Sequence, residues 1–274
     1  METILIPIDF SEASKSVAEY GIQFAKERNA KLILLHVFHI PVYAGDDVAF
    51  MPPYDELEKS NVISMNKFEK ELREKYTFTN PIENIIKSGF LINEIVDTVE
   101  EKEISLIIMG ISEAGKLSEI LLSSNSVGVI KNTNCPTLIV PEGVSYRSIN
   151  TIVFACDDIE KIAETSAAEQ IVGFVKLFNS KLIVLTVVES FEKLDQEILL
   201  EAKKEVLFEG LNYSVLFIEG DNIVKNINNF IEKHNADLLI MIPRKHTVFS
   251  KLFRESNTKK MAFNSHIPLL AIHE

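Results

Sequence analysis

Hydrophobic and polar positions follow two recurring patterns along the chain. Short, nearly continuous apolar runs such as Leu32–Phe38 are typical of parallel strands that are buried on both faces. Longer segments between them carry apolar side chains at helical spacing, as Val17, Tyr20 and Phe24 do between residues 12 and 27. This alternation predicts right-handed βαβ units, and therefore a parallel sheet that is covered by helices on both faces.

Each half of the chain predicts five strands. Ser11 is a typical N-cap for the first helix, because its hydroxyl can accept a free backbone N–H at the helix start. In the first half we expect strands at Thr3–Ile8, Leu32–Phe38, Ile82–Ile86, Leu106–Met109 and Thr137–Val140, and helices at residues 12–27, 55–75, 91–101 and from 124 onward. In the second half we expect strands at 151–156, 182–188, 214–218, 237–241 and 268–272, and helices at 159–178, 195–208, 223–234 and 256–264.

The second half repeats the first. Three pairs of segments match at offsets of 148, 150 and 132, namely residues 4–9 with 152–157, 30–36 with 180–186, and 109–142 with 241–274. The repeat predicts two domains, at residues 1–142 and 149–274, joined by a polar linker. The smaller last offset means that the first copy carries extra residues, and the Pro-rich stretch 41–53 is the obvious candidate. This stretch is either a lid over a first site or a protein contact.

Charge narrows the classes of partner. The chain has 274 residues, with 28 Lys and Arg against 40 Asp and Glu, and a formal net charge of −12. Such an acidic chain lacks the basic surface that nucleic acids or anionic membranes require, so we expect neither as a partner. The start lacks a signal-peptide pattern, and no apolar stretch reaches the ~20 residues that span a bilayer. With two cysteines and no disulfide framework, a cytoplasmic protein is expected.

Motifs for catalysis and metal binding are missing from the sequence. The six histidines have no zinc-site spacing, and neither a Gly-x-Ser-x-Gly elbow nor a P-loop occurs. No nucleophile is placed beside a general base with an orienting partner. We therefore expect no catalytic residues and no metal, and we expect His36, within a buried strand, to be a hydrogen-bonded core residue.

Two polar segments are candidates for ligand binding. Ligands of open parallel sheets bind beyond the carboxyl ends of the strands. Asp9 follows the first strand, and residues 110–126 follow the fourth strand with glycines, serines and the start of a helix. Free backbone N–H groups at a helix start favour anions, so this edge of the sheet predicts an anionic ligand.

Over essentially its whole length, the sequence resembles the universal stress protein family in its tandem two-domain form. The motifs that carry the resemblance are Ile6-Pro-Ile-Asp9-Phe-Ser11, Leu35-His36-Val37, the loop that begins at Gly110, and Cys135-Pro136-Thr-Leu-Ile-Val140. The resemblance implies two Rossmann-like domains of the adenine nucleotide alpha hydrolase-like class, each with a five-stranded parallel sheet and helices on both faces. In nucleotide-binding members the Asp position contacts the ribose, the Val37 position lies against adenine, and the loop wraps the phosphates. ATP or AMP is thus the implied ligand, and the implied site residues are Pro7, Ile8, Asp9, Val37, Met109, Gly110, Ser124 and Asn125.

The phosphate loop departs from the family pattern. Glu113 and Ser123 occupy the second and third glycine positions of that pattern, although Gly110 and Ser124 are kept. A carboxylate ~4 Å from a phosphate costs roughly 1–4 kcal/mol, which weakens binding by roughly fivefold to several hundredfold. The second copy has Ile242, Lys245 and Glu255 at the glycine positions, which predicts a degenerate second domain. The basic residues 244–246 are either an anion site or a solvated loop.

Three functions compete on these grounds. The resemblance favours a non-catalytic stress-response binding and regulatory protein, with weak adenine-nucleotide binding in the first domain. A nucleotide-independent protein-interaction or scaffold module is the alternative, and a nucleotide hydrolase has the least support. The family's dimers commonly pair their last strands antiparallel, so we expect Thr137–Val140 to meet Leu269–Ile272 within one chain, as an intramolecular pseudo-dimer. A homodimer and an unidentified protein partner are further expectations.

Overall fold

The computed structural model describes residues 2–39, 53–110, 124–156, 162, 165–188, 190, 208, 210–243 and 266–274. Several expectations fall outside the described residues: the helices at 195–208 and 256–264, the stretch 41–52 and the basic residues 244–246. The described chain folds into two compact units. One unit comprises residues 2–110, 124–135 and 142–146, and the other comprises the described residues of 136–141 and 147–274.

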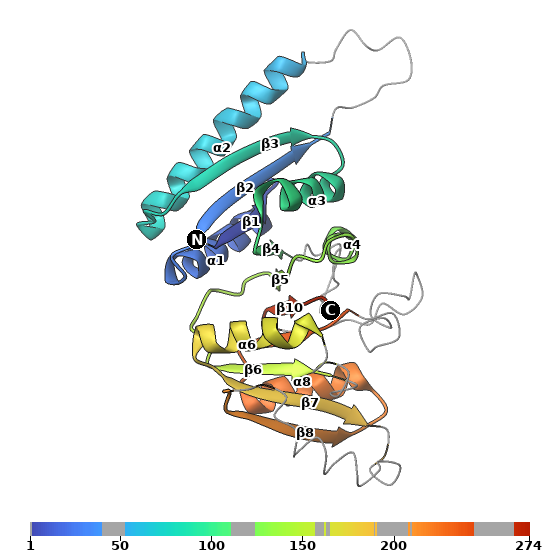
Figure 1. The fold of residues 1–274 in the computed structure, drawn as a ribbon. Coiled ribbons are helices and arrows are strands. Elements are labelled where there is room, and N and C mark those ends of the chain that lie inside the picture. Colours follow the sequence, from blue (N-terminus) through green and yellow to red (C-terminus); the bar gives the residue numbers. More distant parts are fainter. Residues whose placement is uncertain are drawn as a thin grey trace, which may run out of the picture. The chain divides into compact units, whose positions relative to one another are not determined.

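The first unit is a four-stranded parallel sheet between two pairs of helices (Figure 1). Its strands lie in the order β3-β2-β1-β4, and they are β1 (Thr3–Pro7), β2 (Lys31–Phe38), β3 (Ile82–Ser88) and β4 (Leu106–Gly110). Its helices are α1 (Glu12–Glu27), α2 (Tyr54–Tyr76), α3 (Leu91–Lys102) and α4 (Ser124–Asn132). α1 contacts α2, and α3 contacts α4. Right-handed crossovers place the first pair on one face of the sheet and the second pair on the other.

The second unit repeats this succession of strands. Its parallel strands lie in the order β8-β7-β6-β9-β10, and they are β6 (Thr151–Ala155), β7 (Lys181–Val188), β8 (Tyr213–Glu219), β9 (Leu238–Met241) and β10 (Leu269–Ala271). Its described helices are α6 (Ser166–Phe178) and α8 (Ile223–His234). The structure thus has the predicted Rossmann-like α/β architecture, in which both halves of the sequence adopt the same strand order.

One strand of the first sequence repeat joins the second unit. β5 (Thr137–Val140) pairs antiparallel with β10, with Leu138 opposite Leu270. The prediction that these two strands meet within one chain is therefore confirmed. Because the two strands pair, each supplies the other with the backbone hydrogen-bond partners that an edge strand lacks. All four residues of β5 and all three of β10 are buried.

The backbone at the helix ends repeats as well. Asn29 and Asn179 match at the offset of 150, and both adopt a left-handed conformation just after a helix, with φ of 51°. Glu103 and Asn235 match at the offset of 132, and both end a helix in the same conformation. Asparagine tolerates positive φ better than glutamate does. Asn235 after α8 is therefore more favourable in this conformation than Glu103 after α3.

The start of α6 corrects a sequence expectation. A helix was expected from residue 159, but α6 begins at Ser166. Thr165 immediately before it has an extended backbone, with φ of −114° and ψ of 159°, and its N–H donates to the carbonyl of Ile162. Residue 162 is itself helical, so the extended backbone of Thr165 divides the expected helix, and apolar periodicity by itself does not locate such a break.

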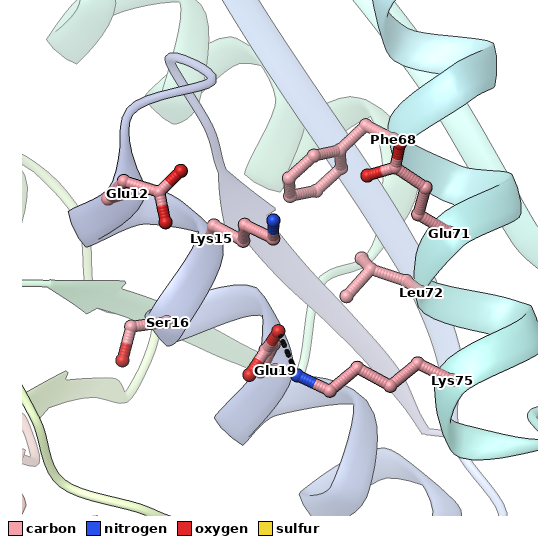
Figure 2. A pocket seen from close by; sticks show the side chains of 8 residues that line it. All are labelled: Glu12, Lys15, Ser16, Glu19, Phe68, Glu71, Leu72 and Lys75. Carbon is pink, nitrogen blue, oxygen red and sulfur yellow. Dashed lines mark hydrogen bonds and ion pairs between the residues drawn. The ribbon is translucent and has the colours of Figure 1, made fainter.

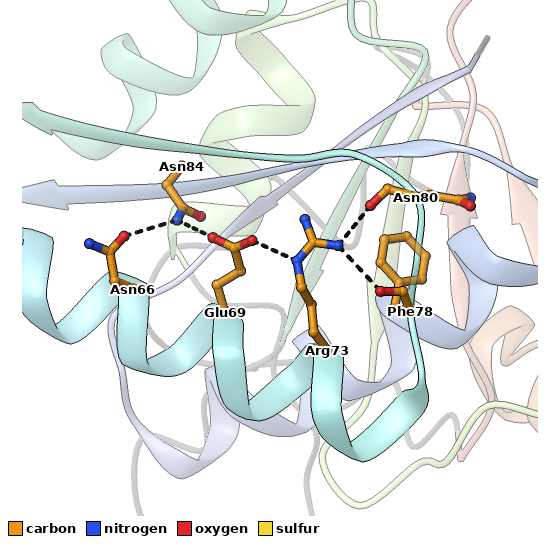
Figure 3. A network of polar contacts seen from close by, with 6 residues as sticks. All are labelled: Asn66, Glu69, Arg73, Phe78, Asn80 and Asn84. Atoms are coloured by element: carbon orange, nitrogen blue, oxygen red, sulfur yellow. Dashed lines mark hydrogen bonds and ion pairs between the residues drawn. The ribbon is translucent and has the colours of Figure 1, made fainter.

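A chain of polar contacts fastens α2 to the rest of the first unit (Figure 3). Asn84 on β3 donates to Oε2 of Glu69 at 2.5 Å, and Arg73 donates to the other oxygen of Glu69 at 2.7 Å. Arg73 also donates to the carbonyls of Asn80 and Phe78, beyond the end of the helix. The half-buried Glu69–Arg73 pair therefore fixes both the distance and the register of α2 against β3.

Candidate functional site

Six of the eight predicted site residues lie at the carboxyl ends of three neighbouring strands. Pro7 ends β1 and lies opposite Leu35 of β2, and the N–H of Ile8 donates to the carbonyl of Leu35 at 2.8 Å. Asp9 follows directly, and Val37 lies two residues beyond Leu35 on β2. The second strand beside β1 is β4, which ends with Met109 and Gly110. The parallel sheet thus places these residues along one edge.

The other two predicted residues open helix α4. Ser124 is its first residue, and Asn125, which is exposed, is its second. The hydroxyl of Ser126 donates to the carbonyl of Gly110 at 3.2 Å, which holds the first turn of α4 beside the end of β4. All eight positions are therefore brought to one end of the first unit. The residues between Gly110 and Ser124 lie outside the described part of the chain, and nucleotide binding by this edge stays a prediction.

Asp9 presents a charged carboxylate at this edge. Its Oδ1 accepts the backbone N–H of Ser11 at 3.0 Å and the Ser11 hydroxyl at 2.5 Å, while Oδ2 has no hydrogen-bond partner among the described residues. Burial alone raises the pKa of the Asp9 carboxyl, but the hydrogen bonds from Ser11 and Ser14 outweigh it and lower the pKa. Asp9 is therefore ionised at neutral pH.

Ser11 holds both Asp9 and the start of helix α1. Its hydroxyl oxygen accepts the N–H of Ser14 at 3.2 Å, which confirms the predicted N-cap. Ser14 in turn donates its hydroxyl to the carbonyl of Ser11. The carboxylate of Asp9 thus lies at a fixed, capped helix start.

His36 lies beneath this turn as a core residue. Its side chain is 9% exposed, and Nδ1 donates to the carbonyl of Ile8 at 2.9 Å. The expectation of a hydrogen-bonded core histidine is confirmed. Because a carbonyl only accepts, Nδ1 must carry the proton in this contact.

Gly110 has a packing role that is independent of any ligand. A Cβ atom at this position would lie 2.6 Å from Cγ2 of Val17 on α1, closer than such carbons approach. In the second repeat the matching residue is Ile242, which is 6% exposed, and Ala167 matches Val17 at the offset of 150. The larger residue that follows β9 is therefore accompanied by a smaller residue on α6. Gly110 by itself does not indicate a phosphate site.

A separate groove of about 410 Å³ lies between α1 and α2 (Figure 2). It has an apolar floor and a charged rim, and it is lined by Glu12, Lys15, Ser16, Glu19, Phe68, Glu71, Leu72 and Lys75. The Glu19 carboxylate accepts from Lys75 at 2.6 Å and from the Tyr76 hydroxyl at 2.9 Å. None of the eight predicted site residues lines this groove. Sequence reasoning could not find it, because it depends on which two helices lie side by side.

The described residues hold no group of three His, Cys, Asp or Glu side chains that could bind a metal ion. None of the described helices combines the length and the apolar character that a membrane-spanning helix requires. Both cysteines are buried and neither forms a disulfide, and burial raises the pKa of Cys135 to about 12.

Acid is expected to destabilise the fold. Hydrogen bonds from Lys102 and Lys31, at 2.6 and 2.5 Å, lower the pKa of Glu83, and the pKa of Asp9 and of Glu19 is lowered too. A carboxyl with a depressed pKa binds fewer protons in the folded state than in the unfolded state. Its contribution is therefore complete above the ordinary pKa of about 4 and is lost as the pH falls through the folded value.

Urea unfolding at pH 7, 5, 4 and 3 measures this effect. We expect the unfolding free energy to change little down to pH 5 and to fall below it. The variant Glu83→Gln should show a shallower fall, whereas Glu58→Gln, which alters an exposed carboxylate on α2, should follow the parent. A parent curve that is flat to pH 3 would contradict the expectation.

The fold, the strand order and the polar edge define a duplicated Rossmann-like protein. The family model of the universal stress protein family matches residues 1–141 and again residues 148–273. The two matches cover nearly the whole chain, and the chain belongs to this family. The tandem form that the sequence resembled is thereby confirmed.

Individual relatives agree with this assignment. Universal stress protein MJ0531 of Methanocaldococcus jannaschii is 33% identical over 138 residues, which cover 50% of this chain and 80% of the relative. Universal stress protein MJ0577 of the same organism is 33% identical over 154 residues, covering 50% of this chain and 93% of the relative. A solved universal stress protein of Archaeoglobus fulgidus is 24% identical, with a TM-score of 0.74, and covers 99% of this chain and 98% of its own. This last likeness shows a shared fold across the whole chain.

Proposed function

We propose that this universal stress protein is a non-catalytic, stress-response binding and regulatory protein whose first repeat binds ATP or AMP weakly. The observation that carries the proposal is the exposed, ionised carboxylate of Asp9 at the sheet edge that also holds Val37 and Gly110. In this proposal Oδ2 of Asp9 accepts a ribose hydroxyl, and Val37 lies against the base. The free N–H groups of the first turn of α4 face the phosphates.

The second repeat is proposed to have lost nucleotide binding. It carries Ile242, Lys245 and Glu255 where the family pattern has glycines. Ile242 is buried, so a large side chain occupies the end of β9 where the first repeat has none. We propose that this repeat serves as the partner in an intramolecular pair, for which the β5–β10 pairing is the support. Two buried cysteines that form no disulfide support the proposal of a cytoplasmic, reducing location.

The variant Asp9→Asn tests the proposal. It removes the charge but keeps the shape, and a hydrogen bond to a charged group contributes about 1.5–3 kcal/mol. We expect the affinity for AMP, measured by calorimetry, to fall by roughly 10- to 150-fold. Glu12→Gln is the matched control, because it neutralises a carboxylate of the first turn of α1 that lies outside the predicted set. Equal losses in both variants, or a parent that binds neither ATP nor AMP below millimolar concentration, would refute the assignment.

ATP turnover assays test the alternative that the protein is a nucleotide hydrolase. Steady ATP turnover that is abolished by Asp9→Asn would support that alternative.

A second candidate function is a nucleotide-independent protein-interaction module. Among the described large apolar side chains, Phe90 at 71% and Ile63 at 69% are the most exposed, and in this candidate function they would bury their side chains against a protein partner. A parent that fails to bind nucleotide while Phe90→Ser and Ile63→Ser abolish self-association in sedimentation experiments would favour this candidate. Self-association that is unchanged in both variants would count against it.

A further inference from the structure

Phe10 adopts a backbone conformation that its residue type disfavours. Its φ is 63°, in the left-handed region. The other described non-glycine residues with positive φ all lie at or just after the carboxyl end of a helix, where this conformation is common: Asn29, Thr77, Glu103, Asn179 and Asn235. Phe10 instead joins a strand to a helix start. A bulky residue in this region is an outlier that its surroundings must hold in place.

Aromatic contacts hold Phe10 in this conformation. The centre of its ring lies 4.5 Å from the centre of the His36 ring on β2, at a tilt of 39°. It lies 6.0 Å from the centre of the Phe68 ring on α2, in an edge-on arrangement. Phe68, which also forms the floor of the α1–α2 groove in Figure 2, is 8% exposed. The ring of Phe10 is thus held between β2 and α2. Offset and edge-on ring contacts of this kind are favourable beyond the apolar area that they bury.

The same cluster fixes the backbone on the other side of Asp9. His36 donates from Nδ1 to the carbonyl of Ile8, the residue before Asp9. Ser11, the residue after Phe10, donates its N–H and its hydroxyl to Oδ1 of Asp9. The left-handed turn at Phe10 returns the Ser11 donors toward the Asp9 carboxylate. The direction of that carboxylate therefore depends on the conformation of Phe10.

We propose that Phe10 and His36 are positioning residues for Asp9, because the contact between their rings holds the left-handed turn that directs the Asp9 carboxylate along the ligand edge. The inference rests on the proposed function only in that the ligand is an adenine nucleotide. The second repeat offers an internal comparison. At the matching offsets it carries Asp158 and Thr186, so both rings are missing in the repeat that also lacks the motif glycines.

Three variants separate the role of the aromatic rings from the need for positive φ at position 10. Phe10→Gly still permits positive φ but removes the ring, Phe10→Tyr keeps both, and His36→Gln removes the ring beneath. Phe90→Leu is the control, since it removes an exposed ring of the same unit that contacts His39 instead. The two readouts are the pKa of the Asp9 carboxyl, followed by carbon-13 NMR titration, and the affinity for AMP, measured by calorimetry.

We expect Phe10→Gly and His36→Gln to raise the pKa of Asp9 toward its ordinary value and to weaken AMP binding about tenfold, which is the loss of one charged hydrogen bond. Phe10→Tyr and Phe90→Leu should match the parent in both readouts. An unchanged pKa of Asp9 in Phe10→Gly or in His36→Gln would overturn the inference, and either variant decides it if the other does not fold. A parent that binds no AMP defeats the proposed function, while the pKa comparison still tests the positioning role.

Discussion

Truncation of Phe154 to alanine is expected to lower the free energy of unfolding by about 3–5 kcal/mol, the range for a fully buried aromatic side chain. Phe154 is 0% exposed. It lies on β6, opposite Val184 of β7 on one side and Ile240 of β9 on the other. The centre of its ring also lies 6.3 Å from the centre of the Phe208 ring, in an edge-on arrangement. The vacated space is therefore bounded on several sides by strands that cannot move inward together.

Phe90→Ala is the matched control for this substitution. It removes the same side chain from a position that is 71% exposed, and we expect it to change stability by no more than about 0.5 kcal/mol. Urea unfolding followed by far-ultraviolet circular dichroism measures both variants. A loss below about 1 kcal/mol for Phe154→Ala would mean that the core of the second unit is looser than its burial indicates.

Replacement of Glu113 by glycine is expected to tighten AMP or ATP binding by roughly fivefold to several hundredfold. The expectation depends on the sequence, in which Glu113 occupies the second glycine position of the family's phosphate loop. A carboxylate within ~4 Å of a phosphate costs roughly 1–4 kcal/mol, depending on how well water screens the pair. At about 1.4 kcal/mol for each tenfold step, this cost gives the stated range. ATP should gain more than AMP, because it carries more phosphate charge.

Glu119→Gly is the control for Glu113→Gly. It introduces the same change of charge and flexibility into the same loop, but away from the motif position. Titration calorimetry with ATP compares the two variants with the parent. An equal gain in both would mean that loop charge in general, and not the residue at position 113, limits binding. If neither variant binds ATP more tightly than the parent, the Glu113 carboxylate does not explain the weak binding.

Local sequence patterns predicted the fold because each βαβ unit is encoded locally. Apolar runs located the described strands, and the hydroxyl of Ser11 marked the start of α1. The restart of the pattern in the second half predicted the repeated strand order. The apolar spacing predicted one unbroken helix from residue 159, but the extended backbone of Thr165 makes α6 begin only at Ser166.

The location of the candidate site could be predicted from the sequence, but the packing contacts that constrain its residues could not. Parallel strands bring their carboxyl ends to one edge, so Asp9, Val37 and Gly110 could be placed together from strand order alone. That a side chain at position 110 would collide with Val17 depends on how closely α1 approaches β4, and neither segment by itself fixes that distance. The left-handed turn at Phe10 is likewise held by rings from β2 and α2, far away in the sequence.

The sequence by itself determined the duplicated α/β architecture and predicted the edge at which a ligand would bind, because hydrophobic periodicity and strand order are properties of short segments. Only the tertiary structure decided which residues touch across elements. It revealed the groove between α1 and α2, the contact of Gly110 with Val17 and the ring cluster around Phe10. Such contacts depend on the distance and angle at which two elements pack, and these are set by all the side chains between them together.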